Sequence, residues 1–231
     1  MGGTFFKTLS FVVGLSLTTA FAASAGTILN PGGVIGPPGT ITYGGTIVAG
    51  LSGTFSASTS TGQFTGSYTA IVYSDPNNLL CSGCYDFVIN LNSNFGSTDN
   101  IERISDGTFN MSGVLVGTDA PLTGRTTPCA TPTSTNCYKD VTSVSRTTDG
   151  SSISFSFSGD NNIAGGESSA SLVIQTGGTV YAPGSLAIQD DVTADSLSFG
   201  NVGTPEPMTI ALLGGGLAFL GLTRLRTSRK K

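Results

Sequence analysis

The central part of the chain alternates apolar and small polar residues with a period of two and sustains no helical period. The clearest stretch is Ser151–Ser158, in which Ile153, Phe155 and Phe157 fall on one face and serines on the other. Successive side chains of a strand point to opposite faces, so this pattern predicts a half-buried β-strand. Further strands are expected at Thr40–Ala49, Gln63–Tyr73, Tyr85–Leu91, Gly107–Val116, Asp140–Arg146, Ser169–Thr176, Ser185–Gln189 and Ala194–Phe199.

Turns of glycine, proline, asparagine and aspartate separate these runs, and the whole chain contains 33 glycines. Many short strands with frequent turns are typical of antiparallel sandwiches and jelly rolls. We therefore predict one all-β domain, a single antiparallel β-sandwich or jelly-roll-like fold, over residues 26–203. Residues 26–40 are expected to form an extended lead-in, and Asp149-Gly150 a turn between two strands.

The N-terminal segment has the features of a signal peptide. Lys7 and the α-amino group give a weak positive region, and Leu9–Leu17 is a short apolar run. Ala23-Ser24-Ala25 fits a small-residue cleavage site before Gly26. We predict that residues 1–25 direct export across the inner membrane and are removed.

The C-terminal segment is apolar over a membrane-spanning length. Met208–Leu225 contains no acid and would extend roughly 27 Å as a helix, close to the thickness of the bilayer hydrocarbon. We predict a transmembrane helix over residues 208–223, with residues 26–204 outside the cytoplasmic membrane. A buried helix of a soluble domain is the alternative. The basic tail 224–231 disfavours it and indicates a cytoplasmic end through Arg224, Arg226, Arg229, Lys230 and Lys231.

The tripeptide Pro205-Glu206-Pro207 stands directly before this apolar run and its basic tail. Residues 204–231 resemble the PEP-CTERM sorting signal of Gram-negative bacteria. The resemblance implies that an exosortase, a membrane cysteine transpeptidase-like enzyme, recognises Pro205, Glu206 and Pro207 and removes the anchor. The product is then expected at the cell surface or in the extracellular matrix, often in bacteria that make exopolysaccharide. The family usually has Ser or Thr after the motif, whereas here Met208 intervenes before Thr209.

The charge of the exported segment limits its partners. Residues 26–203 hold four basic and thirteen acidic side chains, a net charge near −9, although the whole chain totals −4. An acidic surface of this kind argues against nucleic acid and anionic membrane surfaces as partners. Cations and neutral or cationic polymers remain compatible with it.

The chain contains no histidine. This excludes Ser-His-Asp and Cys-His catalysis and the usual zinc hydrolase sites. We predict a protein that is not an enzyme and has no cofactor. One catalytic alternative stays open, because a pair of carboxylates could serve a surface glycosidase.

Four cysteines, Cys81, Cys84, Cys129 and Cys137, indicate two disulfides in an exported chain. Pairing of neighbours, Cys81 with Cys84 and Cys129 with Cys137, is favoured, and crossed pairing stays open. A redox Cys-x-x-Cys needs a helix N-terminus, whereas this one precedes a strand. A four-cysteine zinc site is also disfavoured, because the second pair is too widely spaced for a knuckle.

Two acidic loops are weak calcium candidates. One contains Asp160, Asn162 and Glu167, and the other contains Asp190, Asp191 and Asp195. Neither has the alternating oxygens, central glycine and final glutamate of an EF-hand. Solvated turn carboxylates are the favoured interpretation, so no metal is predicted.

Together these features predict a non-catalytic surface or matrix protein with a structural or adhesive role in association with exopolysaccharide. Exposed tyrosines such as Tyr43, Tyr85 and Tyr181, together with the acidic loops, are expected to contact polymer. The alternatives are a surface carbohydrate-active enzyme with paired carboxylates, or an unprocessed single-pass protein that tethers a periplasmic domain.

Overall fold

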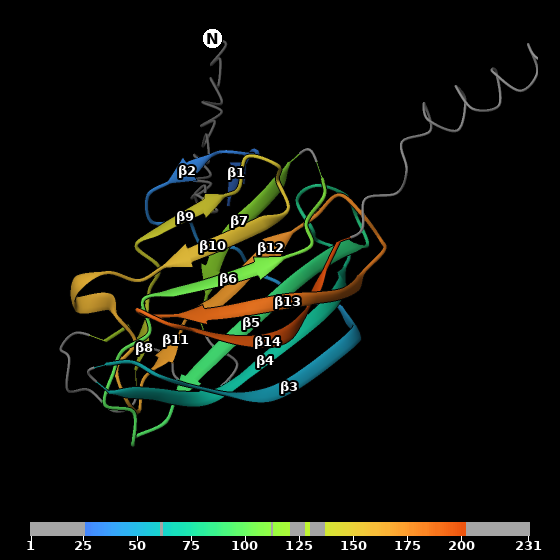
Figure 1. Ribbon diagram of the computed structural model, residues 1–231. Helices are drawn as coiled ribbons and strands as arrows, with labels where there is room; N and C mark the ends of the chain where they lie inside the picture. Colours follow the sequence, from blue (N-terminus) through green and yellow to red (C-terminus); the bar gives the residue numbers. More distant parts are fainter. Residues whose placement is uncertain (1–25, 61, 112, 121–127, 130–136, 202–231) are drawn as a thin grey trace, which may run out of the picture.

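The computed structural model describes residues 26–60, 62–111, 113–120, 128–129 and 137–201 (Figure 1). Within these ranges the fold is all-β, which confirms the predicted class. The elements are β1 (Thr27–Leu29), β2 (Val34–Ile35), β3 (Thr46–Ser58), β4 (Gln63–Asp75), β5 (Cys84–Ser93), β6 (Arg103–Gly107), β7 (Val114–Asp119), β8 (Tyr138–Lys139), β9 (Ser143–Arg146), β10 (Ser152–Ser156), the 3-10 turn η1 (Gly159–Asn161), β11 (Ser168–Ser169), β12 (Ser171–Gln175), β13 (Ala182–Gln189) and β14 (Thr193–Gly200).

The predicted signal peptide (1–25), the motif Pro205–Pro207, the helix 208–223 and the basic tail 224–231 lie outside the described residues. Among the residues that are described, none belongs to a helix long and apolar enough to cross a membrane.

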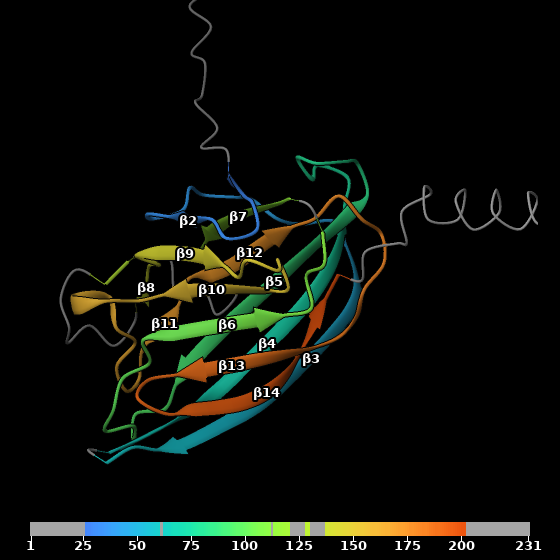
Figure 2. The same cartoon turned by 45° about the horizontal axis from the view of Figure 1, so that its top comes forward.

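The strands form two curled sheets. Sheet A runs β1-β7-β12-β5-β4-β3, and β11 and β8 extend it beside the second half of β5. Sheet B runs β14-β13-β6-β10-β9-β2. The pairing between strands is antiparallel, as predicted, except that β8 and β11 are parallel. Figure 2 shows sheet B lying across sheet A, with β3 and β14 at the same margin.

One hydrophobic core joins the two sheets. Sheet A contributes inward-pointing side chains such as Phe64 and Phe87, and sheet B contributes Ile104 and Phe155, all of them buried. The ring of Phe109, between β6 and β7, meets Phe87 edge-on with centroids 5.3 Å apart. Burial of each such side chain stabilises the fold by roughly 1.5–3 kcal/mol. The period-two pattern therefore identifies the core-facing positions of these strands.

Strands with clear alternation lie where the sequence predicts them. Those are β4, β5, β10 and β12, with shifts of a few residues at their ends. The glycine of the predicted turn Asp149-Gly150 has φ +75°, and its N–H donates to Thr147 O at 2.9 Å.

Two expectations about strands are wrong, and the expected extended lead-in proves to include two short strands. The run Gly107–Val116 is not one strand, because β6 ends in sheet B at Gly107 and the chain crosses to begin β7 in sheet A. Thr108 at this crossing has φ +83°, which ends the extended conformation. Thr40–Ala49 is also not one strand, since Thr40 forms only an isolated bridge and β3 begins at Thr46. The lead-in 26–40 contains the short edge strands β1 and β2.

The buried side chain of Arg146 connects backbone segments near β1 through hydrogen bonds. Its guanidinium donates to the backbone oxygens of Leu29, Phe109, Met111 and Gly150 at 2.7–3.1 Å. Burial lowers the pKa of Arg146, an effect that the nearby Asp149 partly offsets. The buried guanidinium therefore has a structural role, because it satisfies four backbone carbonyl groups with charge-assisted hydrogen bonds.

The cysteines pair with their neighbours, Cys81 with Cys84 and Cys129 with Cys137. This is the favoured pairing of the sequence, and crossed pairing is wrong. Two disulfides are consistent with an extracellular or periplasmic location.

Candidate functional site

The outer face of sheet A, which points away from the core, has an apolar half and a polar half. On the apolar half, Val88 and Val173 are buried against Ile41 and Tyr43, which belong to the segment 36–45. Ile41 is itself only 2% exposed, so this segment covers its half of the face. A ligand that binds this face of sheet A would therefore contact the polar half.

Hydroxyl and amide side chains form rows across the polar half. One row follows the strand register over β3, β4, β5, β12 and β7, and consists of Ser52, Thr69, Asn90, Ser171 and Asp119. The Ser171 hydroxyl donates to Asn90 Oδ1 at 2.8 Å and lies 3.1 Å from the hydroxyl of Tyr43. The members on β3 and β4 are exposed or half-buried, whereas Asn90 and Ser171 are buried. Tyr43, a predicted polymer contact, therefore stands at the border between the two halves.

A second row lies beside the first. It consists of Thr54, Ser67, Asn92 and Ser168. No charged side chain belongs to this row, and Asp119 is the only one in the first. The members that reach the surface are Ser52 and Thr54 on β3, Ser67 and Thr69 on β4 and Asn92 on β5, whereas Asn90, Ser168 and Ser171 are 0–1% exposed. The surface part of the two rows on β3 and β4 therefore presents neutral hydrogen-bonding groups.

A hollow of about 290 Å³ opens where the first row reaches the end of β7. Its walls are Pro37, Pro38, Thr40, Thr118, Asp119, Ala120, Tyr138, Asp140 and Val141. Burial raises the pKa of the Asp140 carboxyl. Burial, together with the charges of Asp140 and Asp119, raises the pKa of Tyr138. Among the described residues, the walls contain carboxylates and no basic group, which suits a neutral or cationic ligand.

A second hollow, of about 370 Å³, lies on sheet B beside the β13–β14 turn. Glu102, Arg103, Asp190 and Asp191 line it. Burial raises the pKa of Asp190 to about 6, with further contributions from the Asp99 carboxyl and from the charges of Glu102 and Asp191.

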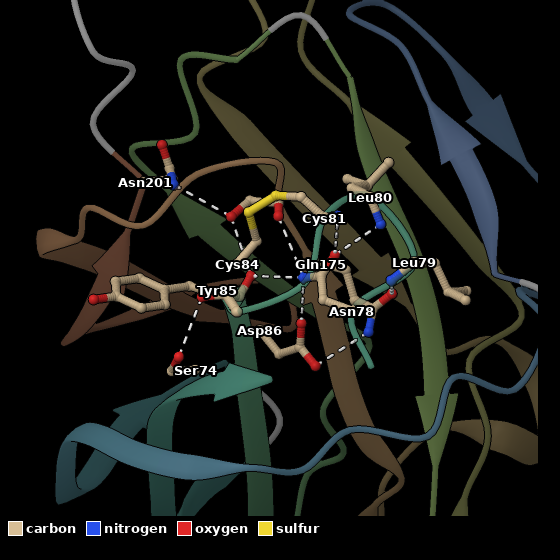
Figure 3. Close-up of a disulfide and its surroundings, with 12 residues drawn as sticks. Ser74, Asn78, Leu79, Leu80, Cys81, Cys84, Tyr85, Asp86, Gln175 and Asn201 are labelled. Atoms are coloured by element: carbon tan, nitrogen blue, oxygen red, sulfur yellow. Dashed lines mark hydrogen bonds between the residues drawn. A yellow bond between two sulfur atoms is a disulfide. The ribbon is translucent and has the colours of Figure 1, made fainter. Parts of the chain in front are cut away.

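The Cys81–Cys84 disulfide closes a loop over a buried carboxyl group (Figure 3). Asp86 Oδ1 accepts from Asn78 Nδ2 at 2.7 Å, and its Oδ2 accepts from Gln175 Nε2 at 3.1 Å. Burial raises the pKa of Asp86 to about 7, the two amides lower it, and the neighbouring Asp75 carboxyl raises it again. Asp75 and Asp86 are 1% and 0% exposed, so this carboxyl pair is a structural element and not an open catalytic site.

The first calcium candidate is occupied by a cation of the protein itself. Lys139 Nζ donates to the backbone oxygen of Asp160 at 2.6 Å and lies 3.4 Å from Glu167 Oε1. The side chain of Asn162 instead donates to Glu102 Oε1 at 3.1 Å. The Lys139 ammonium therefore contacts the backbone oxygen of Asp160 and the carboxylate of Glu167, whereas the side chain of Asn162 bonds to Glu102. Cys129 and Cys137 lie near Glu167 but are bonded to each other, so they offer no thiolate to a metal.

The second calcium candidate is split between two elements. Asp190 and Asp191 line the second hollow in the β13–β14 turn, whereas Asp195 lies within β14 opposite Ala187.

The other two predicted polymer-contacting tyrosines lie together. The rings of Tyr85 and Tyr181 have centroids 6.0 Å apart, and Phe199 stands edge-on to Tyr181 at 5.5 Å. Tyr181 is 37% exposed. This small aromatic cluster is separate from the polar rows, and it packs beside the core as much as it faces solvent.

Sequence reasoning missed the Asp119–Asp140 hollow and the rows on the outer face. The hollow joins residues from three distant segments, which no local pattern reveals. The rows leave a weak signal, because serine and threonine alternate with core residues along β3 and β4. No family model, curated protein or solved structure matches this chain.

Proposed function

We propose that this chain is a non-catalytic, exported protein of the cell surface or extracellular matrix, with a structural or adhesive role in association with exopolysaccharide. The observation that carries the proposal is the pair of polar rows on sheet A. Hydroxyl and amide groups exchange hydrogen bonds with sugar hydroxyls. The nearly uncharged rows also suit a neutral polymer, a class that the net charge near −9 of residues 26–203 leaves open.

Retention on the host's own exopolysaccharide tests this role. We expect the double variant S67A/T69V to bind about tenfold more weakly in affinity electrophoresis, because two hydrogen-bonding groups are lost. The matched control S145A/S156A removes two half-buried serines from the outer face of sheet B and is expected to bind like the wild type. Wild-type protein that is not retained, or equal loss in both variants, would contradict the proposal.

The sorting route is part of the same proposal. An exosortase-like enzyme is proposed to cleave at Pro205–Pro207, after transient anchoring in the membrane through the helix 208–223. The two disulfides support export. Mass spectrometry of membrane and extracellular fractions is expected to find a mature form that begins near Gly26 and ends near Pro205–Pro207. If Met208–Lys231 stays attached in the membrane fraction, the protein is an unprocessed single-pass tether.

One observation favours a carbohydrate-active enzyme as the second candidate. Asp119 and Asp140 line the same hollow, and burial raises the pKa of Asp140, as a general acid requires. Incubation of the wild type and Asp140→Asn with host polysaccharide separates the two candidates. Reducing ends released by the wild type alone would establish the enzyme, and none released by either would leave the binding role.

A further inference from the structure

β3 is a long strand at the margin of sheet A. It has 13 residues and pairs along one side with β4. Figures 1 and 2 show it running along the lower border of the molecule, beneath β14. A bulge lies between Ile47 and Ala49, and the Tyr181 hydroxyl approaches the backbone oxygen of Val48 at 3.5 Å. The regular stretch of this edge is therefore 50–58.

The hairpin that joins β3 to β4 fixes which backbone groups point outward. Thr59 N donates to Gly62 O at 2.8 Å, so these two residues form a hydrogen-bonded pair. Hydrogen-bonded and non-hydrogen-bonded pairs alternate along an antiparallel ladder. The residues of β3 that turn their N–H and C=O away from β4 are thus Gly50, Ser52, Thr54, Ser56 and Ser58. All five are exposed, and the described part of the chain provides no hydrogen-bond partner for their backbone groups.

This edge lacks the features that keep edge strands apart. Such strands are usually protected by charged side chains, proline or a central bulge. β3 contains no charge and no proline, and its bulge lies at one end. The sequence has no charged residue from Thr8 to Ser74, whereas residues 75–203 hold all seventeen charges of the exported segment. The β3 strand itself therefore brings no charge to a contact between two acidic copies, and the nearby carboxylates are Asp99, which accepts a hydrogen bond from Thr59 at the hairpin end, and Asp195 on the adjacent β14.

We propose that two copies of this chain associate through antiparallel pairing of their β3 strands, which joins their A sheets into one continuous sheet. With Thr54 opposite Thr54 of the second copy, Ser52 faces Ser56 and Gly50 faces Ser58. In this register all five outward N–H groups and all five outward C=O groups of each copy are paired, which gives ten hydrogen bonds across a two-fold axis. The small facing side chains present no steric obstacle.

Cross-linking of the protein in both the membrane and the extracellular fractions of the host tests the register. Thr54→Cys places two thiols in facing positions about 5.5 Å apart between Cα atoms, so a short bis-maleimide is expected to give a covalent dimer. Ser58→Cys is the matched control on the same edge, because its thiols would be separated by about eight residues, or roughly 27 Å. Thr54→Cys without a dimer, or equal dimer from both variants, would overturn the proposal.

A charge pair provides a second, independent test in the Thr54→Cys background. In S52K/S56K an ammonium group faces an ammonium group at both symmetric positions, whereas in S52K/S56E each ammonium faces a carboxylate. We expect about tenfold less cross-linked dimer from S52K/S56K than from S52K/S56E. Both variants carry bulky side chains at the same sites, so equal yields would show that β3 does not form the contact.

Discussion

Replacement of Glu167 by Gln is expected to lower the free energy of unfolding by about 3–5 kcal/mol. Lys139 and Glu167 have side chains only 3% and 4% exposed, with 3.4 Å between Nζ and Oε1. The glutamine keeps the shape and the hydrogen bond from Ala164 N, which Glu167 Oε2 accepts at 2.8 Å. It removes the negative charge, however, so the Lys139 ammonium would stay buried without a counter-charge. Urea denaturation at neutral pH measures the loss.

Two further variants separate charge from packing. Glu102→Gln makes the same chemical change at an exposed position and is expected to alter stability by less than about 0.5 kcal/mol. The double variant Lys139→Met/Glu167→Leu removes both charges and keeps the apolar volume, so it is expected to recover most of the loss and to fall short of the wild type only by its hydrogen bonds to Ala164 N and Asp160 O. Equal behaviour of Glu167→Gln and Glu102→Gln would show that the ion pair is not buried in solution.

The fold was predictable where one face of a strand is apolar and the other is polar. Ile153, Phe155 and Phe157 place β10 within one or two residues of its position because burial of that face dominates. The second half of β3 was missed, since Gly50, Gly53 and its serines have little preference for strands. Pairing with β4 over its whole length supplies the order there.

The candidate site was less predictable, because its residues meet only through the tertiary fold. Glu167 fits a calcium loop in the sequence, yet the fold brings Lys139 to it from another strand. Asp119 and Asp140 share a hollow although twenty residues, Cys129 and Cys137 among them, separate them in the chain. In contrast, pairing of neighbouring cysteines depends on short separation alone, and there the sequence sufficed.

Stability is expected to fall as the pH rises from about 4 to about 7, by up to roughly 1.4 kcal/mol per pH unit for each group concerned. The pKa of Asp86 is raised to about 7, mainly by burial, whereas an unfolded aspartate titrates near 3.9. Between these values the folded state holds a proton that the unfolded state has released, so stabilisation is complete below pH 4 and is lost as the pH passes 7. Burial also raises the pKa of Asp106 well above its ordinary value, which adds a contribution of the same sign.

One surface group acts in the opposite sense over a different range. Hydrogen bonds from Thr147 and Ser151 lower the pKa of Asp149 to about 2. The stabilisation of the fold by this ionised carboxylate is therefore present above pH 4 and disappears as the pH falls toward 2. Measurements between pH 4.5 and pH 8 therefore exclude the titration of Asp149 and follow the carboxyls whose pKa is raised, which are Asp86, Asp106, Asp140 and Asp190.

The variant Asp86→Asn tests whether Asp86 causes this pH dependence of stability. An asparagine does not titrate but retains an oxygen for Asn78 or Gln175, so we expect a smaller slope of unfolding free energy against pH, with the remainder coming from Asp106, Asp140 and Asp190. Asp195→Asn, at an exposed position on β14, is the matched control and should keep the wild-type slope. Urea midpoints for the three proteins at each pH give the comparison. A wild type that gains stability up to pH 7, or an Asp86→Asn variant with an unchanged slope, would mean that the carboxyl beneath the Cys81–Cys84 loop is ionised in the folded protein. In that case Asn78 and Gln175 stabilise a buried charge, and the loop above them is held by charge-assisted hydrogen bonds instead of a retained proton.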